Sequence, residues 1–291
     1  MIKLVQYLHG NNWVPAAVAA YSVRKHGNIS AEHVLYSTDP DVLANPYLTK
    51  IFDKIAWPEW NWRALWQMDL CMERNHPYHD GHIPAWPSDF RKYALTKYGC
   101  FLHEQGEVLF LDNDILCVGD INGVISRAPL KWSARYWEYR DSPRLNGGVL
   151  YHGSGWDARD FIRPLEDHNA LEESFKIHRL DDEACASWSM IRHGITDLFQ
   201  LPAIYNMSIA SATPKARLIH YNAIEKPWLG RYMNGVRGFY EQWTAIAEEA
   251  CEAIGYPVDG SGVSDRFKWP HRLGEWKPKE KDKPLRWRTF A

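Results

Sequence analysis

Two aspartates that follow an apolar run near the middle of the chain have the spacing most indicative of chemistry. The run covers residues 108–111 and has the pattern of a buried strand, and Asp112 and Asp114 come directly after it. On an extended backbone, residues two apart point to the same side. Two such carboxylates repel each other unless a cation lies between them, which indicates a hard divalent ion, Mg²⁺ or Mn²⁺, shared with a diphosphate. Asp-Asn-Asp is also favourable turn chemistry, so a purely structural turn is the alternative.

The elements that would position these aspartates alternate between strand and helix patterns. We expect strands at residues 2–8, 33–37, 51–56, 108–111, 147–152 and 216–220, and helices at 14–26, 90–98, 181–193 and 239–254. Gly27 suits the C-cap of the first helix. Strands separated by helices predict an α/β fold, with a mainly parallel mixed sheet flanked by helices. In such sheets ligands bind at the carboxyl ends of the strands, where the two aspartates lie.

Composition narrows the class of protein. The chain has 291 residues and a formal net charge of −2, so no global field attracts nucleic acid and we expect no nucleic-acid partner. Met1 leads directly into a strand pattern without the leader of a signal peptide, and no apolar stretch has the length of a transmembrane helix. Five dispersed cysteines fit reduced core thiols. Together these features predict a cytoplasmic protein.

The end of the chain differs from the rest. Residues 266–291 contain nine Lys or Arg against three acids, with three prolines and three tryptophans. We therefore predict one main domain over residues 1–258 and a basic extension over 259–291. Basic residues interleaved with Trp are suited to peripheral contact with an anionic membrane surface. The alternative is a tail that wraps its own domain through the aromatic side chains.

Several segments, in order along residues 2–230, share motifs with one enzyme family. They are the strand and helix at 4–26, Asp-Asn-Asp at 112–114, Asn-Gly-Gly-Val at 146–149, Asp-Glu at 182–183, Leu-Pro-Ala-Ile-Tyr-Asn at 201–206, and His220 followed after five residues by Lys-Pro-Trp at 226–228. This set resembles the family 8 glycosyltransferases, the group that contains glycogenin and bacterial lipopolysaccharide galactosyltransferases. Gly147 departs from the family pattern, which usually has Ser there, and this removes one hydroxyl contact.

The resemblance implies a GT-A fold, a Rossmann-like nucleotide-diphosphosugar transferase. It also implies an enzyme that moves a hexose from a UDP-sugar with retention of configuration, assisted by Mn²⁺ or Mg²⁺. His220 would be the third metal ligand beside Asp112 and Asp114, as a neutral imidazole. The acceptor, whether saccharide, lipid-linked or protein, does not follow from the resemblance. A nucleotide-sugar hydrolase or nucleotidyltransferase, a non-catalytic nucleotide-sugar binding protein and a lectin-like module are the alternatives.

Basic residues are expected to contact the diphosphate of the donor. By the resemblance, Lys226 would place an ammonium on the charge that develops as the diphosphate departs, the alternative being a solvated lysine before Pro227. Lys92, on the helix before the aspartate strand, is a second candidate, and Arg91 is its rival. We also expect Asn113, between the two aspartates, at the donor site.

The first strand and the loop after it are expected to hold the nucleotide base. Tyr7, His9 and Trp13 lie there, and a planar side chain stacked on a base contributes on the order of 1 to 3 kcal/mol. Core packing is the alternative for Tyr7. The resemblance makes uridine the usual base, although these three residues do not specify it.

Two polar residues are candidates for the sugar and the reaction centre. Asp182 is placed to bind sugar hydroxyls, to stabilise positive charge at the anomeric carbon, or to act as nucleophile, whereas capping of a helix by Asp181 and Asp182 is the alternative. Asn146 precedes two glycines that let the backbone approach closely, and we expect it to contact sugar hydroxyls.

Two clusters lie outside the shared motifs. The tryptophans at 57, 60, 62 and 66 would suit an acceptor platform, although the spacing of the last two fits a core helix equally well. His76, His79 and His82 would suit a second metal, with a polar loop as the commoner alternative.

Overall fold

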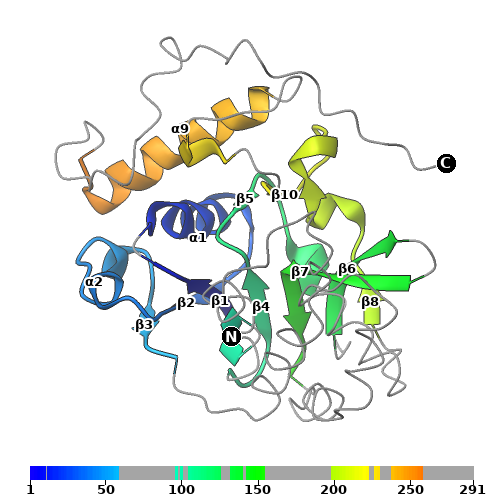
Figure 1. The fold of residues 1–291 in the computed structure, drawn as a ribbon, viewed down its shortest axis with the longest axis horizontal. Helices are drawn as coiled ribbons and strands as arrows, with labels where there is room; N and C mark the ends of the chain where they lie inside the picture. The colour runs from blue at the N-terminus through cyan, green and yellow to red at the C-terminus, as the bar shows by residue number, and fades with distance from the viewer. Residues whose placement is uncertain are drawn as a thin grey trace, which may run out of the picture.

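A mixed seven-stranded sheet is the centre of the molecule. The computed structural model describes residues 1–10, 12–58, 96–97, 99–100, 104–125, 132–139, 142–154, 198–222, 226–229 and 237–257. The strand order is β3-β2-β1-β4-β7-β6-β8, and a second sheet has the order β5-β10-β9. Strands β3, β2, β1 and β4 are parallel, whereas β7 runs antiparallel to β4 and to β6 (Figure 1).

The first strand and helix form where the sequence predicts them. Strand β1 spans Ile2–Leu8 and helix α1 spans Val14–His26. Alternation along β1 turns Leu4 and Leu8 toward the apolar clusters that contain residues of α1. Pro15 lies in the first turn of α1, and the Gly27 N–H still makes a helical bond to the Val23 carbonyl at 2.8 Å. The chain leaves the helix at Asn28, whose φ of 53° is left-handed.

The parallel half of the sheet continues with three further strands. These are β2 at Ala31–Ser37, β3 at Lys54–Ala56 and β4 at Val108–Leu111, and all four residues of β4 are buried. The strand expected at 51–56 begins only at Lys54, because a 3₁₀ turn at Leu48–Lys50 carries Ile51 and Phe52 into the core instead. Helix α2, Pro40–Leu43, is capped by the Asp39 side chain, which accepts from Asp41 N.

The other half of the sheet was only partly predicted. Strand β7 spans Ser142–His152, five residues longer at its start than the strand expected at 147–152. It pairs with β6, Trp132–Tyr139, which in turn pairs in parallel with β8, Leu198–Gln200. Neither β6 nor β8 was predicted. Because β7 is antiparallel to β4, its middle residues pass the carboxyl end of β4.

The second sheet is built from three very short strands. They are β5 at Ile115–Cys117, β9 at Met207–Ser208 and β10 at Leu218–His220. The expected strand at 216–220 corresponds to β10, whereas β5 and β9 were not predicted. The short helical turns nearby are α5 at Asn122–Ile125, η3 at Ala203–Tyr205, η4 at Ile209–Ser211 and η5 at Pro227–Leu229.

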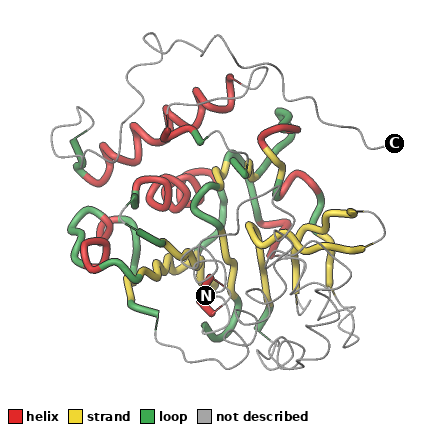
Figure 2. The backbone as a smooth tube through the Cα atoms, in the orientation of Figure 1, coloured by secondary structure: helices red, strands yellow, loops and turns green. Residues whose placement is uncertain are grey.

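Helix α9, Arg237–Ile254, lies over α1, so that α1 is held between α9 and the strands (Figures 1 and 2). Its apolar side, centred on the buried Trp243, belongs to the same cluster as the residues of α1. Cys100, Cys117 and Cys251 are buried and free, as expected of core thiols. Within the described residues, no helix has both the length and the apolar character needed to cross a membrane.

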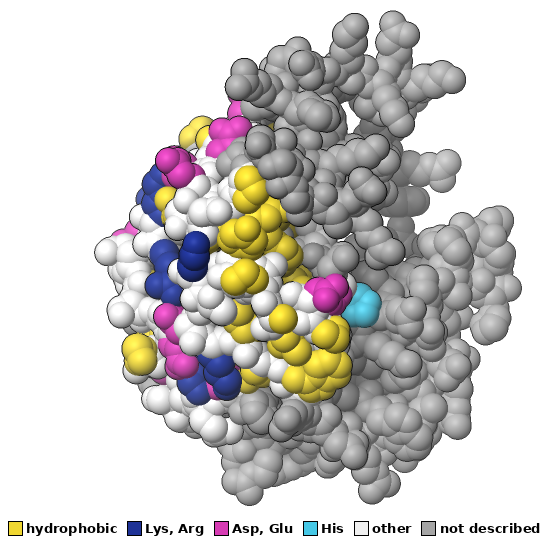
Figure 3. Space-filling view, turned by 90° about the vertical axis from the view of Figure 1, so that its left-hand side faces the viewer, with side chains coloured by type: hydrophobic (Ala, Val, Ile, Leu, Met, Phe, Trp, Pro, Cys, Tyr) yellow, Lys and Arg dark blue, Asp and Glu magenta, His cyan; other side chains and the backbone are white. Residues whose placement is uncertain are grey.

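On the surface at the side of α2, apolar and charged side chains are largely separated. Apolar side chains gather there in a band, and Lys, Arg, Asp and Glu side chains lie mainly to one side of it (Figure 3). Trp57, near the end of the described range 12–58, is 49% exposed, in contrast to the buried Trp243. The exposed indole leaves the acceptor-platform prediction in place for Trp57, whereas the tryptophans at 60, 62 and 66 lie outside the described residues.

Candidate metal centre and donor site

Asp112 and Asp114 lie in a tight turn at the carboxyl end of β4. The ladder between β4 and β7 extends into this turn, because Asp112 N donates to the Gly148 carbonyl at 2.9 Å. Ile115 N then donates to the Asp112 carbonyl at 3.3 Å, and the chain leaves the turn as β5. The turn chemistry and the carboxylate pair foreseen in the sequence are therefore both present, and the turn is what places the carboxylates.

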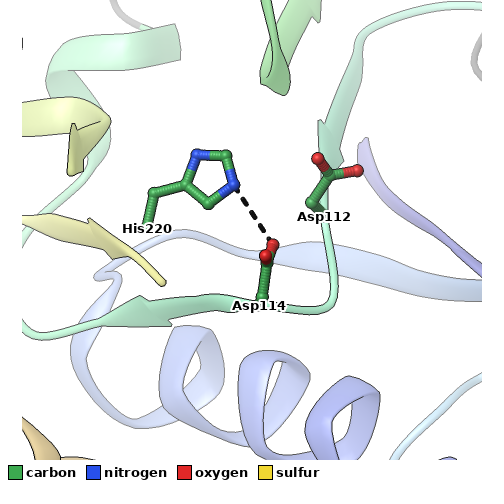
Figure 4. Close-up of side chains that lie close together, drawn as sticks. All are labelled: Asp112, Asp114 and His220. Carbon is green, nitrogen blue, oxygen red and sulfur yellow. Dashed lines mark ion pairs between the residues drawn. The ribbon is translucent and has the colours of Figure 1, made fainter. Parts of the chain in front are cut away.

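His220 comes to the aspartates through the register of the second sheet. Strand β10 is antiparallel to β5 with His220 opposite Ile115, the residue that follows Asp114. Tyr221 N donates to the Asp114 carbonyl at 2.8 Å and fixes that register. As a result His220 Nε2 lies 3.2 Å from Asp114 Oδ1, and one ligand atom from each of Asp112, Asp114 and His220 lies within 4.8 Å of the others (Figure 4).

Two lysines balance the charge of the carboxylates. The Lys226 ammonium forms an ion pair with Asp114 and donates to the Tyr221 carbonyl, and Lys97 Nζ lies 3.6 Å from Asp112 Oδ2. Burial by itself raises the pKa of Asp114, but the charges and hydrogen bonds of His220 and Lys226 outweigh it and hold that pKa below its usual range. The carboxylate of Asp114 is therefore in its ligand form.

Lys97 is a residue that sequence reasoning missed. It is 7% exposed and lies at the helical segment before β4, the segment for which Lys92 was the predicted donor contact. Lys92 and its rival Arg91 lie outside the described residues. No signal in the sequence separates Lys97 from Lys92, because the burial of Lys97 and its distance to Asp112 are seen only in the structure.

A second layer of polar side chains lies behind His220. His220 Nδ1 is 3.0 Å from Asn206 Oδ1, and Asn206 Nδ2 donates to Asn146 Oδ1 at 2.7 Å. Asn146 Oδ1 also accepts from Gly148 N at 3.0 Å. Asn206 is fully buried and Asn146 is 6% exposed. The predicted sugar residue and the predicted metal ligand are thus connected through a residue to which the sequence gave no role.

Gly148 allows this layer to approach the strand. A Cβ at position 148 would lie 2.7 Å from His220 Nδ1 and 3.0 Å from Asn146 Oδ1, and closer still to His220 Cε1. Real Cβ atoms do not come so close to a ring atom. The second glycine of the Asn-Gly-Gly-Val segment is therefore required because a larger residue would clash with His220.

The end of β1 places the predicted base-binding residues in three different settings. Tyr7 is 3% exposed, and burial, more than any other cause, raises its pKa. His9 is exposed. Trp13 is half-buried and packs within the protein, stacked on Tyr47 with ring centroids 6.2 Å apart and edge-on to Tyr256 at 4.8 Å.

Asn113 ties the aspartate turn to β1. Its Nδ2 donates to the Tyr7 carbonyl at 2.7 Å, and its Oδ1 accepts from Gln6 Nε2 at 3.1 Å. These bonds give Asn113 a structural task beside the donor contact predicted for it. The predicted residues Asp182, His76, His79 and His82, and the predicted extension at 259–291, lie outside the described residues.

The group at Asp112, Asp114 and His220 fits a divalent metal ion. Two carboxylate oxygens and one imidazole nitrogen are ligands that divalent metal ions take in proteins. His220 is 5% exposed, and its Nδ1 already has a partner in Asn206, so Nε2 is the ring nitrogen that faces the carboxylates.

The chain resembles solved glycosyltransferase structures in its fold. The galactosyltransferase LgtC in complex with donor and acceptor sugar analogues matches with a TM-score of 0.56 and 15% sequence identity, over 86% of this chain and 96% of that one. The glycosyltransferase GlyE of Streptococcus pneumoniae TIGR4 matches with a TM-score of 0.52 and 14% identity, over 88% of this chain and 66% of that one. No family model and no curated protein matches the chain.

These similarities confirm the predicted fold class. The chain has the GT-A fold, an α/β architecture whose central sheet is rich in parallel strands. The resemblance to family 8 glycosyltransferases that the sequence motifs carry is confirmed at the level of this fold.

Proposed function

We propose that this protein is a glycosyltransferase that moves a hexose from a UDP-sugar to an acceptor, with Mn²⁺ as cofactor and retention of anomeric configuration. The observation that carries the proposal is the group formed by Asp112, Asp114 and His220, with Lys226 beside it, at the carboxyl end of a central strand in a GT-A fold. The neighbour LgtC, crystallised with donor and acceptor sugar analogues, has the same fold and supports a sugar-transfer function.

Departure of a diphosphate requires that its negative charge be stabilised as it develops. A bound divalent ion supplies that stabilisation as a Lewis acid, a contribution of several kcal/mol. Asp112 and Asp114 would hold the ion through carboxylate oxygens, and His220 through Nε2. Lys226 adds a second positive charge at the same edge, and its ammonium would bind the diphosphate.

Asn146 is suited to the sugar because of how its amide is oriented. Its Oδ1 accepts two hydrogen bonds, from Gly148 N and Asn206 Nδ2. Its Nδ2 makes no hydrogen bond with the described part of the chain, so this group is available to donate to a hydroxyl oxygen of the donor sugar.

The remaining roles rest on the sequence. We propose that Asp182 acts at the anomeric carbon, as a stabilising charge or as the nucleophile, and that Tyr7, His9, Trp13, Asn113 and Lys92 contribute to the donor site. For Trp13 and Tyr7 the packing described above favours a supporting role over direct stacking on the base.

Calorimetric binding of UDP with and without Mn²⁺ tests the proposal, followed by a panel of UDP-sugars to name the donor. We expect UDP binding to depend on Mn²⁺, and Asp114→Asn to abolish that dependence. The rate of sugar transfer by Asp114→Asn should fall as well, because a loss of about 4 kcal/mol of transition-state stabilisation lowers a rate roughly a thousandfold. Asp120→Asn is the matched control, because Asp120 is exposed and bonds only to Asn28 and Asn122 among the described residues.

Other results of these measurements would assign the protein to a different functional class. Free sugar released at full rate without an acceptor would make the protein a hydrolase. Donor binding without turnover would make it a nucleotide-sugar binding protein, and binding of glycans without nucleotide a lectin-like module. Near-normal activity of Asp114→Asn would show that the metal ligands are assigned wrongly.

A further inference from the structure

A continuous chain of hydrogen bonds leads from the backbone of β7 to the ring of His220. It starts at Gly148 N, passes through the side-chain amides of Asn146 and Asn206, and ends at His220 Nδ1, with no step longer than 3.0 Å. Asn206 is fully buried, and Asn146, Gly148 and His220 are buried as well. An asparagine enclosed in this way is expensive to keep unless its hydrogen bonds serve the site or the fold.

The direction of every bond in this chain follows from its first donor. A backbone N–H only donates, so the side-chain atom of Asn146 that faces Gly148 N is the oxygen. That same oxygen faces the amide of Asn206, so the Asn206 atom that faces it is the nitrogen. The other amide atom of Asn206, which faces His220, is therefore the oxygen.

The last bond then fixes the proton on the imidazole. Because Asn206 Oδ1 only accepts, His220 Nδ1 must carry a hydrogen. The other ring nitrogen, Nε2, lies 3.2 Å from Asp114 Oδ1, and because a carboxylate oxygen only accepts, Nε2 donates to it when no metal is bound. A metal ion held by the carboxylates would take the place of that one hydrogen, while Nδ1 keeps its bond to Asn206. A histidine binds a metal through the nitrogen that carries no proton, and the hydrogen bond at the other nitrogen selects which one that is.

We propose that Asn206 is a positioning residue that holds His220 with a hydrogen on Nδ1 and with Nε2 directed at the two carboxylates, so that Nε2 is the nitrogen left for a metal, and that at the same time orients the Asn146 amide. The role in metal binding rests on the proposed function, whereas the tautomer of His220 does not. Because one amide bonds to both neighbours, Asn206 links the side of the site expected to bind sugar to the side expected to bind metal.

Nitrogen NMR of protein labelled with ¹⁵N-histidine tests this in the absence of metal. Long-range ¹H–¹⁵N correlations distinguish the two neutral tautomers, and His220→Gln identifies the signal among the 13 histidines. We expect a hydrogen on Nδ1 of His220 in the wild type, because Nδ1 faces the Asn206 oxygen. Asn206→Ala should shift the ring toward the form with a hydrogen on Nε2 alone, and Asn122→Ala, which removes an exposed asparagine bonded to the Asn28 carbonyl, should not.

Asn206→Asp covers the case in which the alanine variant does not fold. Aspartate keeps an acceptor for the Nδ1–H bond and has nearly the same shape, so the Nδ1–H form should persist, although the bond to Asn146 is lost. A hydrogen on Nε2 alone in the wild type, the same form in Asn206→Asp, or an unchanged tautomer in folded Asn206→Ala would each overturn the proposal.

The role of Asn206 in metal binding is tested by the Mn²⁺ affinity, measured by electron paramagnetic resonance of the free ion in the presence of UDP. Changes behind a metal-bound histidine typically weaken metal binding 10–100-fold, and we expect a loss in this range for Asn206→Ala with no change for Asn122→Ala. A tautomer shift without any loss of Mn²⁺ affinity would overturn the positioning role at the metal. A tautomer shift in a protein that transfers no sugar would leave the Asn206 assignment standing and remove the proposed activity.

Discussion

Position 148 is where the smallest change of side chain should most disturb the candidate site. A Cβ added there would lie 2.7 Å from His220 Nδ1 and 3.0 Å from Asn146 Oδ1, so the ring of His220 must move. Overpacking of this kind costs about 1–3 kcal/mol. We expect Gly148→Ala to weaken Mn²⁺-dependent UDP binding at least about tenfold, as measured by calorimetry, since about 1.4 kcal/mol corresponds to a factor of ten.

Gly238→Ala is the matched control for that substitution. Gly238 lies in α9, and a Cβ there would meet no atom within 4 Å. Alanine is a better helix former than glycine by up to about 1 kcal/mol, so this variant should keep UDP binding and unfold at the same or a higher temperature. Equal UDP binding by the two alanine variants would mean that His220 does not depend on the space at Gly148.

The lysines near the two aspartates show which site residues can be predicted from the sequence and which cannot. Lys226 was found because a motif gives its distance from His220, and its ammonium does lie on Asp114. Lys97 was not predicted, because no motif fixes the register of the preceding helix, whereas Lys92 lies outside the described residues and stays a prediction. Residues five apart on a regular helix point about 140° apart, so the choice between Lys92 and Lys97 depends on a rotation that sequence alone does not give.

At the scale of elements, local patterns predicted what local forces determine. Strand β1, helix α1 and strand β4 lie at their predicted bounds, because each has its own apolar pattern and its own end signals. Strands β5 and β9 have three and two residues, too few to show a period, and they exist because β10 pairs with both. The contact between Asn206 and Asn146 joins residues 60 apart and has no local signal.

The pairing of β2 with its neighbours includes a buried histidine that should make stability depend on pH. His33 is 2% exposed, and burial, with a smaller effect of the Arg24 charge, lowers its pKa to about 4. Its unfolded pKa is about 6.5, so the unfolded chain binds more protons between these values. Stability should be fully present above pH 6.5 and fall with pH, by about 1.4 kcal/mol at pH 5.5 and about 3 kcal/mol near pH 4.

Urea unfolding of the wild type and of His33→Phe at pH 7.5 and 5.5 measures this effect. We expect the variant to lose most of the difference between the two pH values. His26→Phe is the control, because His26 is only half-buried at the end of α1 and should retain most of the difference. Parallel pH dependence in His33→Phe and the wild type would assign the acid sensitivity to other groups.

For the whole molecule, the candidate site lies where two sheets meet. Asp112 follows a strand of the large sheet, whereas His220 belongs to the small sheet β5-β10-β9. Neither sheet holds three ligands alone, so metal binding should depend on the turn at Asp112–Asp114 that joins them. The sequence predicted which residues would meet, from motifs, but the antiparallel register that makes His220 face Asp114 became visible only in the structure.

The basic extension gives the last prediction, which concerns where the molecule acts. Removing residues 264–291 takes away nine Lys or Arg and four acids. A basic residue near an anionic surface contributes about 1 kcal/mol, so the truncated chain should bind vesicles containing phosphatidylserine far more weakly in a sedimentation assay, with UDP binding unchanged. A full-length variant with Lys277, Lys279, Lys281 and Lys283 changed to Gln keeps the tryptophans and separates charge from aromatic insertion. Undiminished vesicle binding after truncation, together with a lower unfolding temperature, would instead mean that the extension packs on its own domain.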